Sequence, residues 1–133
     1  MIVFDSYAWI EYFLGSDYGK IVKKYIDNEE VVTPSVVLAE IARKYLREGV
    51  AEEDVAKRLS FIATKTSIMQ IDVELSVAAA KAYLELFEKA KMDKLEKPSL
   101  TDGIVLATGR ILGAKIVTGD KHFKGFSEVV YIG

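Results

Sequence analysis

Cysteine is absent from this chain of 133 residues. That absence excludes a disulfide framework, a thiolate zinc site and a cysteine nucleophile. Histidine is represented by His122 alone, and proline by two residues. No Ser/His/Asp triad can be assembled around His122 from the sequence pattern, and no Gly-rich loop has the spacing that cradles a nucleotide phosphate.

The chain also lacks an excess of basic over acidic residues and a long apolar run. The formal net charge is −2 at pH 7, whereas proteins that hold nucleic acid mainly through counterion release are usually basic. Nucleic-acid binding here would therefore need a local patch or a metal. The N-terminal apolar run ends at Asp5, and no stretch approaches the roughly 20 apolar residues of a membrane span. We expect a cytoplasmic protein without a membrane segment.

Short apolar runs alternate with longer segments of helical period along the chain. A length of 133 residues fits one domain, residues 1–133, and this alternation is typical of an α/β fold with a parallel sheet. The predicted strands are Ile2 to Phe4, Val31 to Thr33, Ile68 to Ile71, Lys115 to Thr118 and Val129 to Ile132.

The segments between these runs predict covering helices. Apolar residues recur at helical spacing within residues 21–26, 37–46 and 55–62. A longer helix is predicted from Val73 to Lys91 and another from Ser99 to Leu112, with Gly49 and Gly113 as helix stops. The inner stripe predicted for the longer helix consists of Val77, Ala80, Leu84 and Phe87.

Acidic side chains occur close to the predicted strand ends. Asp5 follows the first strand and Asp120 follows the strand that ends at Thr118. Ligands of open α/β sheets bind outside the carboxyl ends of the strands. Glu40 lies among apolar residues in the helix after the second strand, and Asp102 lies in the first turn of the helix from residue 99. The four acids can therefore converge on one edge of the sheet.

Each acid also has a purely structural explanation. Asp5 and Asp120 could cap a helix or a short turn, which stabilises a fold by about 1 kcal/mol. Asp102 could complete a capping box and gain from the helix dipole. Glu40 could pair with Lys44, but such a pair contributes only roughly 0.2 to 0.5 kcal/mol, too little to justify burying the carboxylate.

Convergence of four carboxylates would require a counter-charge. Acids placed close together cannot all stay ionised without raised pKa values or a bound cation. Oxygen ligands without cysteine or paired histidine favour Mg²⁺ or Mn²⁺ and disfavour structural zinc.

At these residues the chain resembles the PIN-domain nucleases, in particular the toxins of VapBC-type toxin–antitoxin modules, over nearly its whole length. The opening IVFDSYAWIEYF resembles the first motif of the family and assigns Asp5 as a metal-site acid, with Ser6 assisting beside it. The stretch TPSVVLAEI resembles the second motif, with its acid at Glu40.

The stretch SLTDGIVLATGRILGAKIVTGDKHF resembles the third and fourth motifs together. It assigns Asp102 and Asp120, with Thr118 as the accompanying hydroxyl residue. Gly103 stands where relatives often have alanine, an exchange that costs about 1 kcal/mol within a helix and leaves the carboxylates unaffected.

The resemblance implies a three-layer PIN-like fold with a central, parallel five-stranded sheet flanked by helices. It also implies cleavage of RNA that depends on Mg²⁺ or Mn²⁺, an antitoxin protein as partner, and a homodimer. Divalent metal can activate water and stabilise charge on a phosphate. Asp5, Glu40 and Asp102 would hold the principal ion directly or through water, and Asp120 would complete the cluster and orient the attacking water.

Two other functions stay open at this point. One is an RNA-processing or quality-control nuclease without an antitoxin. The other is a non-catalytic scaffold that binds RNA or a partner, although the intact set of acids argues against it. A ribonuclease that works without metal usually needs paired acid and base groups, so we interpret His122 as a turn residue. An aspartyl phosphatase would have a second acid where Tyr7 stands.

Contact with RNA is predicted for basic residues near the acids. Arg43, Lys44 and Arg47 lie on the helix that carries Glu40. Lys121 and Lys124 lie beside Asp120. Any one of them can instead belong to a solvated surface, but as a group close to carboxylates they could hold phosphates.

Overall fold

A five-stranded sheet forms the centre of the protein in a computed structural model that describes residues 1–133. All neighbouring strands are parallel, in the order β3-β2-β1-β4-β5. The strands are β1 Ile2–Phe4, β2 Val31–Pro34, β3 Ser67–Met69, β4 Lys115–Thr118 and β5 Val129–Tyr131. In register, Val3 pairs with Val32 on one side and with Ile116 on the other. The predicted α/β fold with a parallel sheet is confirmed.

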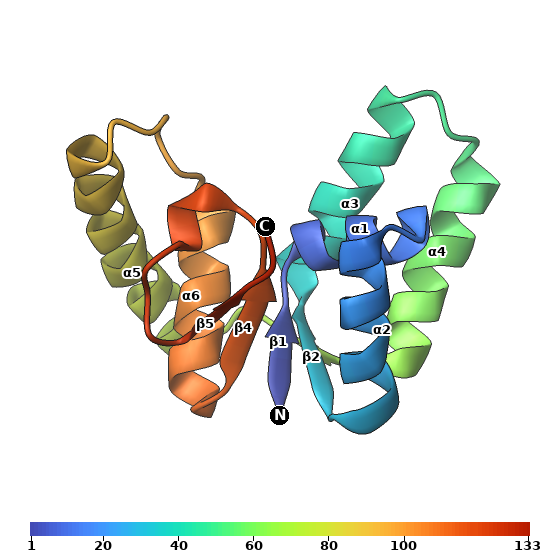
Figure 1. The fold of residues 1–133 in the computed structure, drawn as a ribbon, viewed down its shortest axis with the longest axis horizontal. Helices are drawn as coiled ribbons and strands as arrows, with labels where there is room; N and C mark the ends of the chain where they lie inside the picture. The colour runs from blue at the N-terminus through green and yellow to red at the C-terminus, as the bar shows by residue number, and fades with distance from the viewer.

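Six α-helices and one short 3₁₀ helix connect the strands. They are α1 Ser6–Leu14, α2 Asp17–Asn28, α3 Ser35–Arg47, α4 Glu52–Lys65, α5 Val73–Met92, α6 Leu100–Leu112 and η1 Lys121–Phe123. Figure 1 shows two groups of helices, α1 to α4 on the right and α5 with α6 on the left, with the strands between them. None of these helices combines the length and the apolar character needed to cross a membrane.

The order of strands reverses between β1 and β4. From β1 the chain adds β2 and β3 on one side, and then β4 and β5 on the other. Open α/β sheets bind their ligands at such a reversal, outside the carboxyl ends of the strands. Asp5 directly follows β1, and Thr118 is the last residue of β4. The fold therefore places both residues where a ligand site is expected.

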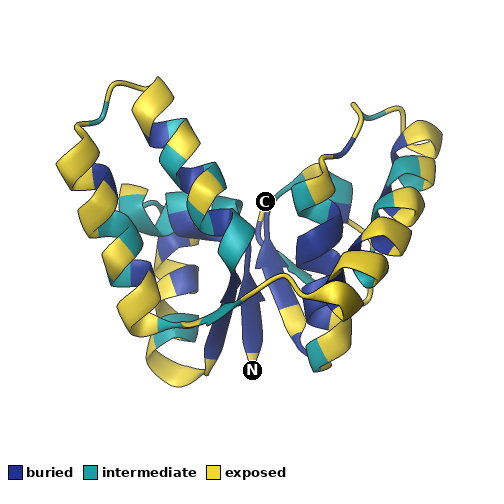
Figure 2. Cartoon of the chain, turned by 180° about the vertical axis from the view of Figure 1, so that it is seen from behind, coloured by how far each residue is buried: buried dark blue, intermediate teal, exposed yellow.

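Trp9 anchors α1 to the sheet. Its ring is fully buried and packs edge-on against Phe4, with ring centroids 5.3 Å apart. The indole Nε1 donates a hydrogen bond to Thr33 Oγ1 on β2 at 3.2 Å. Figure 2 shows that burial is concentrated on the strands and the inward helix faces. Because α1 is held on two strands, the residues at its start are fixed relative to the sheet.

The strand prediction was least accurate at β3. The strand runs from Ser67 to Met69, whereas the prediction was Ile68 to Ile71, and Ile71 is 43% exposed. β3 is an edge strand that pairs only with β2. Apolar residues beyond its last paired position are therefore not held in the sheet.

The predicted inner stripe of α5 was wrong. Val77 is 54% exposed and Leu84 is 62% exposed. Ala80 is also exposed, and Phe87 is half-buried. The buried residues of α5 are Leu75, Ala79, Ala82, Leu86 and Ala90. All five are apolar and recur at helical spacing, and three of them are alanine, which lets α5 pack closely against α6.

Gly103 shows how close that packing is. A Cβ atom at this position would lie 2.7 Å from the carbonyl oxygen of Ala79 and 2.9 Å from Cβ of Tyr83. Gly103 therefore has a packing role in addition to its predicted effect on helix stability, because glycine lets α6 approach the backbone of α5.

Candidate active site

Asp5 lies at the junction of β1 and α1 and is only 6% exposed. Its Oδ1 caps α1 by accepting a hydrogen bond from the backbone N–H of Ala8 at 3.1 Å. Its Oδ2 accepts a hydrogen bond from Thr118 Oγ1 at 2.5 Å, across the reversal of strand order. Burial, with smaller contributions from the charges of Asp120 and Asp102, raises the pKa of Asp5 to about 7 in spite of these two bonds.

Glu40 lies on α3 and faces the start of α1. Ser6 donates a hydrogen bond from Oγ to Glu40 Oε1 at 2.5 Å. Lys44, which could have paired with Glu40, instead pairs with Glu48 at 2.7 Å. The carboxylate of Glu40 is thus held by a hydroxyl group and has no ion pair.

Asp102 is both a helix-capping residue and a cavity residue. It forms a capping box with Ser99, in which Asp102 Oδ2 accepts from the N–H of Ser99 at 3.0 Å and Ser99 Oγ accepts from the N–H of Asp102 at 3.2 Å. Burial raises the pKa of Asp102 to about 6, and the charge of Asp120 contributes to the rise. The capping explanation is therefore correct but incomplete.

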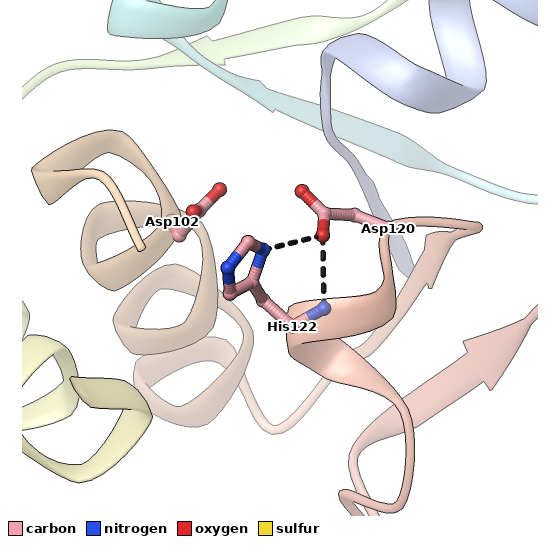
Figure 3. A group of neighbouring side chains, drawn as sticks. All are labelled: Asp102, Asp120 and His122. Atoms are coloured by element: carbon pink, nitrogen blue, oxygen red, sulfur yellow. Dashed lines mark hydrogen bonds and ion pairs between the residues drawn. The ribbon is translucent and has the colours of Figure 1, made fainter. Parts of the chain in front are cut away.

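Asp120 faces Asp102, with the ring of His122 beside the gap between the two carboxylates (Figure 3). Asp120 Oδ1 accepts from the backbone N–H of His122 at 2.9 Å and lies 2.8 Å from His122 Nδ1. The backbone N–H of Asp120 donates to Thr118 Oγ1 at 3.1 Å. Thr118 therefore contacts both Asp5 and Asp120.

The contacts of His122 favour the positively charged form of its ring. Its Nδ1 faces the Asp120 carboxylate, and its Nε2 lies 2.7 Å from the carbonyl oxygen of Glu96. Both partners only accept hydrogen bonds, and only the imidazolium form can donate from both ring nitrogens at once. Burial opposes this charge, but the bonds to Glu96 and Asp120 outweigh it and raise the pKa of His122.

A cavity of about 520 Å³ joins these side chains. All four predicted acids and Ser6 line it, whereas Thr118 is buried behind Asp5. The charged residues of the lining are Asp5, Glu11, Glu40, Asp102, Asp120, Lys44, Lys97 and His122. The excess of acids over cations makes the cavity negative, as a site for a divalent cation requires.

The donor set of the cavity fits such a cation. Oxygen or nitrogen atoms of Asp102, Asp120 and His122 all lie within 4.8 Å of one another, and Asp5 and Glu40 line the same cavity outside this close group. Both nitrogens of His122 already face acceptors, which leaves the carboxylates as the available ligands. Carboxylate oxygens are hard ligands of the kind that Mg²⁺ and Mn²⁺ prefer.

Three of the carboxylates are held by one oxygen only. Glu40 accepts through Oε1, Asp102 through Oδ2 and Asp120 through Oδ1. The second oxygen of each accepts no hydrogen bond from the protein. In each case the hydrogen bond to the first oxygen orients the carboxylate, and the second oxygen remains available to a ligand.

The basic residues predicted to bind RNA lie in different places. Lys44 lines the cavity, and Arg43 lines an adjoining hollow that shares Glu40 and Thr101 with it. Arg47 is exposed near the end of α3 and lines neither. Lys121 and Lys124 line a separate hollow.

Three charged residues of the cavity were not predicted from the sequence as site residues. His122 was interpreted as a turn residue, although its place two residues after Asp120 was a signal of proximity. Glu11 lies one helical turn after Tyr7, which also lines the cavity, so the helical period of α1 could have indicated it. Lys97 lies in the loop before α6, where no periodic pattern places a side chain.

Comparison with protein families matches the model of the PIN domain to residues 2–129. A comparison with curated proteins gives no match.

Among solved structures, the chain is similar to a toxin–antitoxin complex from Klebsiella pneumoniae, with 19% identity, a TM-score of 0.68 and coverage of 98% of this chain and 96% of that chain. It is also similar to VapBC2 from Rickettsia felis bound to a DNA fragment from their promoter, with 18% identity, a TM-score of 0.67 and coverage of 99% and 98%. VapC20 of Mycobacterium tuberculosis, a sarcin–ricin loop cleaving toxin, has 21% identity, a TM-score of 0.68 and coverage of 97% and 98%. The fold of this chain is thus that of VapBC-type toxins.

Proposed function

The chain belongs to the PIN domain family, and from that premise we propose that residues 1–133 form a single nuclease domain. It hydrolyses RNA phosphodiester bonds with the help of a bound Mg²⁺ or Mn²⁺ ion. One observation carries the proposal: Asp5, Glu40, Asp102 and Asp120 line one cavity at the reversal of strand order. Capping explains Asp5 and Asp102 singly, but it gives no reason for four acids to share a cavity.

The role proposed for the enzyme is that of the toxin in a toxin–antitoxin pair, acting in the cytoplasm as a homodimer. The support is the likeness in fold to toxin–antitoxin complexes over nearly the full length of both chains. The partner that this role requires is an antitoxin protein that covers or blocks the cavity. Co-expression with the product of a neighbouring gene, followed by an RNA-cleavage assay, would test this role separately from the chemistry.

In the proposed mechanism, Asp5, Glu40 and Asp102 would hold the ion directly or through water, and Asp120 would help to orient the attacking water. The ion would activate that water and stabilise charge on the phosphate. Thr118 fixes Asp5, and Ser6 fixes Glu40, each through a hydroxyl group that donates to the carboxylate.

The remaining polar groups of the cavity would bind and orient the RNA. Lys44 and Lys97 are suited to hold phosphate oxygens beside the acids, and Arg43 is suited to a phosphate in the adjoining hollow. His122 would keep the carboxylate of Asp120 in one orientation, because its ring is fixed at both nitrogens. Arg47, Lys121 and Lys124 lie outside the cavity, so any contact they make would be with a more distant nucleotide.

The test is cleavage of a panel of labelled RNAs by the purified protein with Mg²⁺, Mn²⁺ or EDTA. Asp5→Asn and Asp102→Asn should each abolish cleavage. Asp72→Asn is a matched control, because Asp72 caps α5 through the N–H of Leu75 at 2.8 Å but lies outside the cavity. It should cleave like the wild type. Cleavage that persists in EDTA, or in both cavity variants, would overturn the proposal.

A further inference from the structure

A second hollow, of about 290 Å³, lies next to the acid cavity at the same end of the molecule. Its lining consists of Lys89, Asp93, Leu95, Lys121, Lys124 and Tyr131. Three lysines against one aspartate make it positive, whereas the acid cavity is negative. The end of α5, the helix η1 and strand β5 build this basic hollow.

Two of the three lysines are free of acidic partners. Lys89 pairs with Asp93 at 2.5 Å and so neutralises the only acid of the basic hollow. Lys124 Nζ lies over the ring of Tyr131, 5.5 Å from the ring centroid, and forms no ion pair. Lys121 is exposed and likewise forms no ion pair. The charge of the basic hollow is therefore available to an anion.

The backbone holds these lysines together. Lys124 precedes Gly125, whose φ of 97° is a left-handed conformation that favours glycine. A Cβ atom at Gly125 would lie 3.6 Å from Cε of Lys89. The turn after η1 thus places the backbone next to Lys124 beside the stem of Lys89, and Lys89, Lys121 and Lys124 line the same hollow.

Only a thin partition separates the basic hollow from the acid cavity. Asp120 and His122 line the cavity, whereas Lys121, between them in sequence, lines the hollow. Similarly, Lys97 lines the cavity and Leu95 lines the hollow. The bond between the His122 ring and the carbonyl oxygen of residue 96 joins these two segments. An extended ligand that crosses this partition would contact the acids on one side and the lysines on the other.

We propose that the basic hollow is a second RNA-binding subsite, which holds backbone phosphates of single-stranded RNA that flank the phosphate in the acid cavity. This inference rests on the proposed ribonuclease function. Lysines bind phosphates as point charges and read no base, so the subsite contributes affinity and register without sequence preference. It also supplies positive charge that the acid cavity, and the chain as a whole, lacks.

The test compares Lys121→Gln/Lys124→Gln with the wild type. Binding of a fluorescent single-stranded RNA is measured by anisotropy in EDTA, and kcat/KM for cleavage is measured with Mg²⁺, both over a range of KCl concentrations. Each lost phosphate contact should make the slope of log affinity against log salt shallower by about 0.7. The double variant should therefore lose about 1.4 from the slope, with a higher KM, an unchanged kcat and an unchanged melting temperature.

The matched control is Lys24→Gln/Lys57→Gln, which removes two exposed lysines of α2 and α4 that line neither the cavity nor the basic hollow. It should keep the wild-type slope. An unchanged slope in Lys121→Gln/Lys124→Gln, with normal cleavage by the wild type, would overturn the subsite and leave the ribonuclease intact. If the wild type neither binds nor cleaves RNA, the ribonuclease proposal fails and the subsite fails with it.

Discussion

Replacing Asp5 by asparagine should stabilise the metal-free protein at neutral and higher pH while it abolishes cleavage. Burial raises the pKa of Asp5 from 3.8 to about 7. Since one pKa unit corresponds to about 1.4 kcal/mol, the ionised carboxylate lowers the free energy of unfolding by roughly 4 kcal/mol. Asparagine carries no charge, yet its side chain can still accept from the N–H of Ala8 and contact Thr118.

The sign of the pH dependence follows from the direction of the shift. The pKa of Asp5 is higher in the folded than in the unfolded protein, so the folded protein binds the proton of Asp5 more tightly. The stability that comes from this protonated carboxyl group is complete below about pH 4. That effect is lost as the pH rises through 7. Asp102, with a pKa raised to about 6, acts in the same direction. The wild type should therefore lose stability between pH 4 and 8, and Asp5→Asn should lose less.

Urea unfolding in EDTA at pH 5, 6, 7 and 8 measures this difference, and repeating it with Mg²⁺ or Mn²⁺ measures the effect of the ion. A ligand that binds only the folded state stabilises it by RT ln(1 + [L]/Kd), so metal should raise the stability of the wild type and not that of Asp5→Asn. Asp72→Asn serves again as the capping control and should show the wild-type pH dependence. If Asp5→Asn were less stable than the wild type at pH 8 in EDTA, or if metal stabilised both equally, the reasoning would be refuted.

Two further predictions concern residues around the acids. Gly103→Ala should lower the melting temperature, because the added methyl group would be overpacked against Ala79 and Tyr83. Overpacking costs about 1 to 3 kcal/mol and outweighs a gain in helix propensity of about 1 kcal/mol. A higher melting temperature in thermal unfolding would contradict this. His122→Asn should weaken metal binding or cleavage by about 10- to 100-fold, as expected for a residue that orients a metal-binding carboxylate. Metal titration by calorimetry measures this, and an unchanged affinity would exclude that role.

The position of Asp5 could be predicted because local and long-range signals agree there. A short apolar run that ends on an acid predicts a strand end, and parallel strands share one carboxyl edge. The alternative, a helix cap, was equally visible in the sequence. The two explanations do not compete in the structure, because one carboxylate oxygen of Asp5 caps α1 and the other meets Thr118.

The predicted stripe of α5 was wrong because large apolar residues occur on two faces of the helix. Val77 and Leu84 are exposed, whereas Leu75 and Leu86 are buried together with three alanines. The choice of face depends on how closely α6 can approach, and that distance depends on Gly103 in a different element. Similarly, the contact of His122 with the carbonyl oxygen of Glu96 joins residues 26 positions apart, and no period relates them.

The acids of the cavity come from separate elements, and hydrogen bonds between those elements set their geometry. Thr118 joins β4 to Asp5 after β1, and Ser6 joins α1 to Glu40 on α3. Each of these donors is a neutral hydroxyl group, so it orients a carboxylate without neutralising it. An ion pair in the same place would cancel the charge that a cation must find. Asp120 differs, because it faces the ring of His122. For Asp5, burial is the largest cause of the raised pKa, and hydrogen bonds from neutral donors do not offset it.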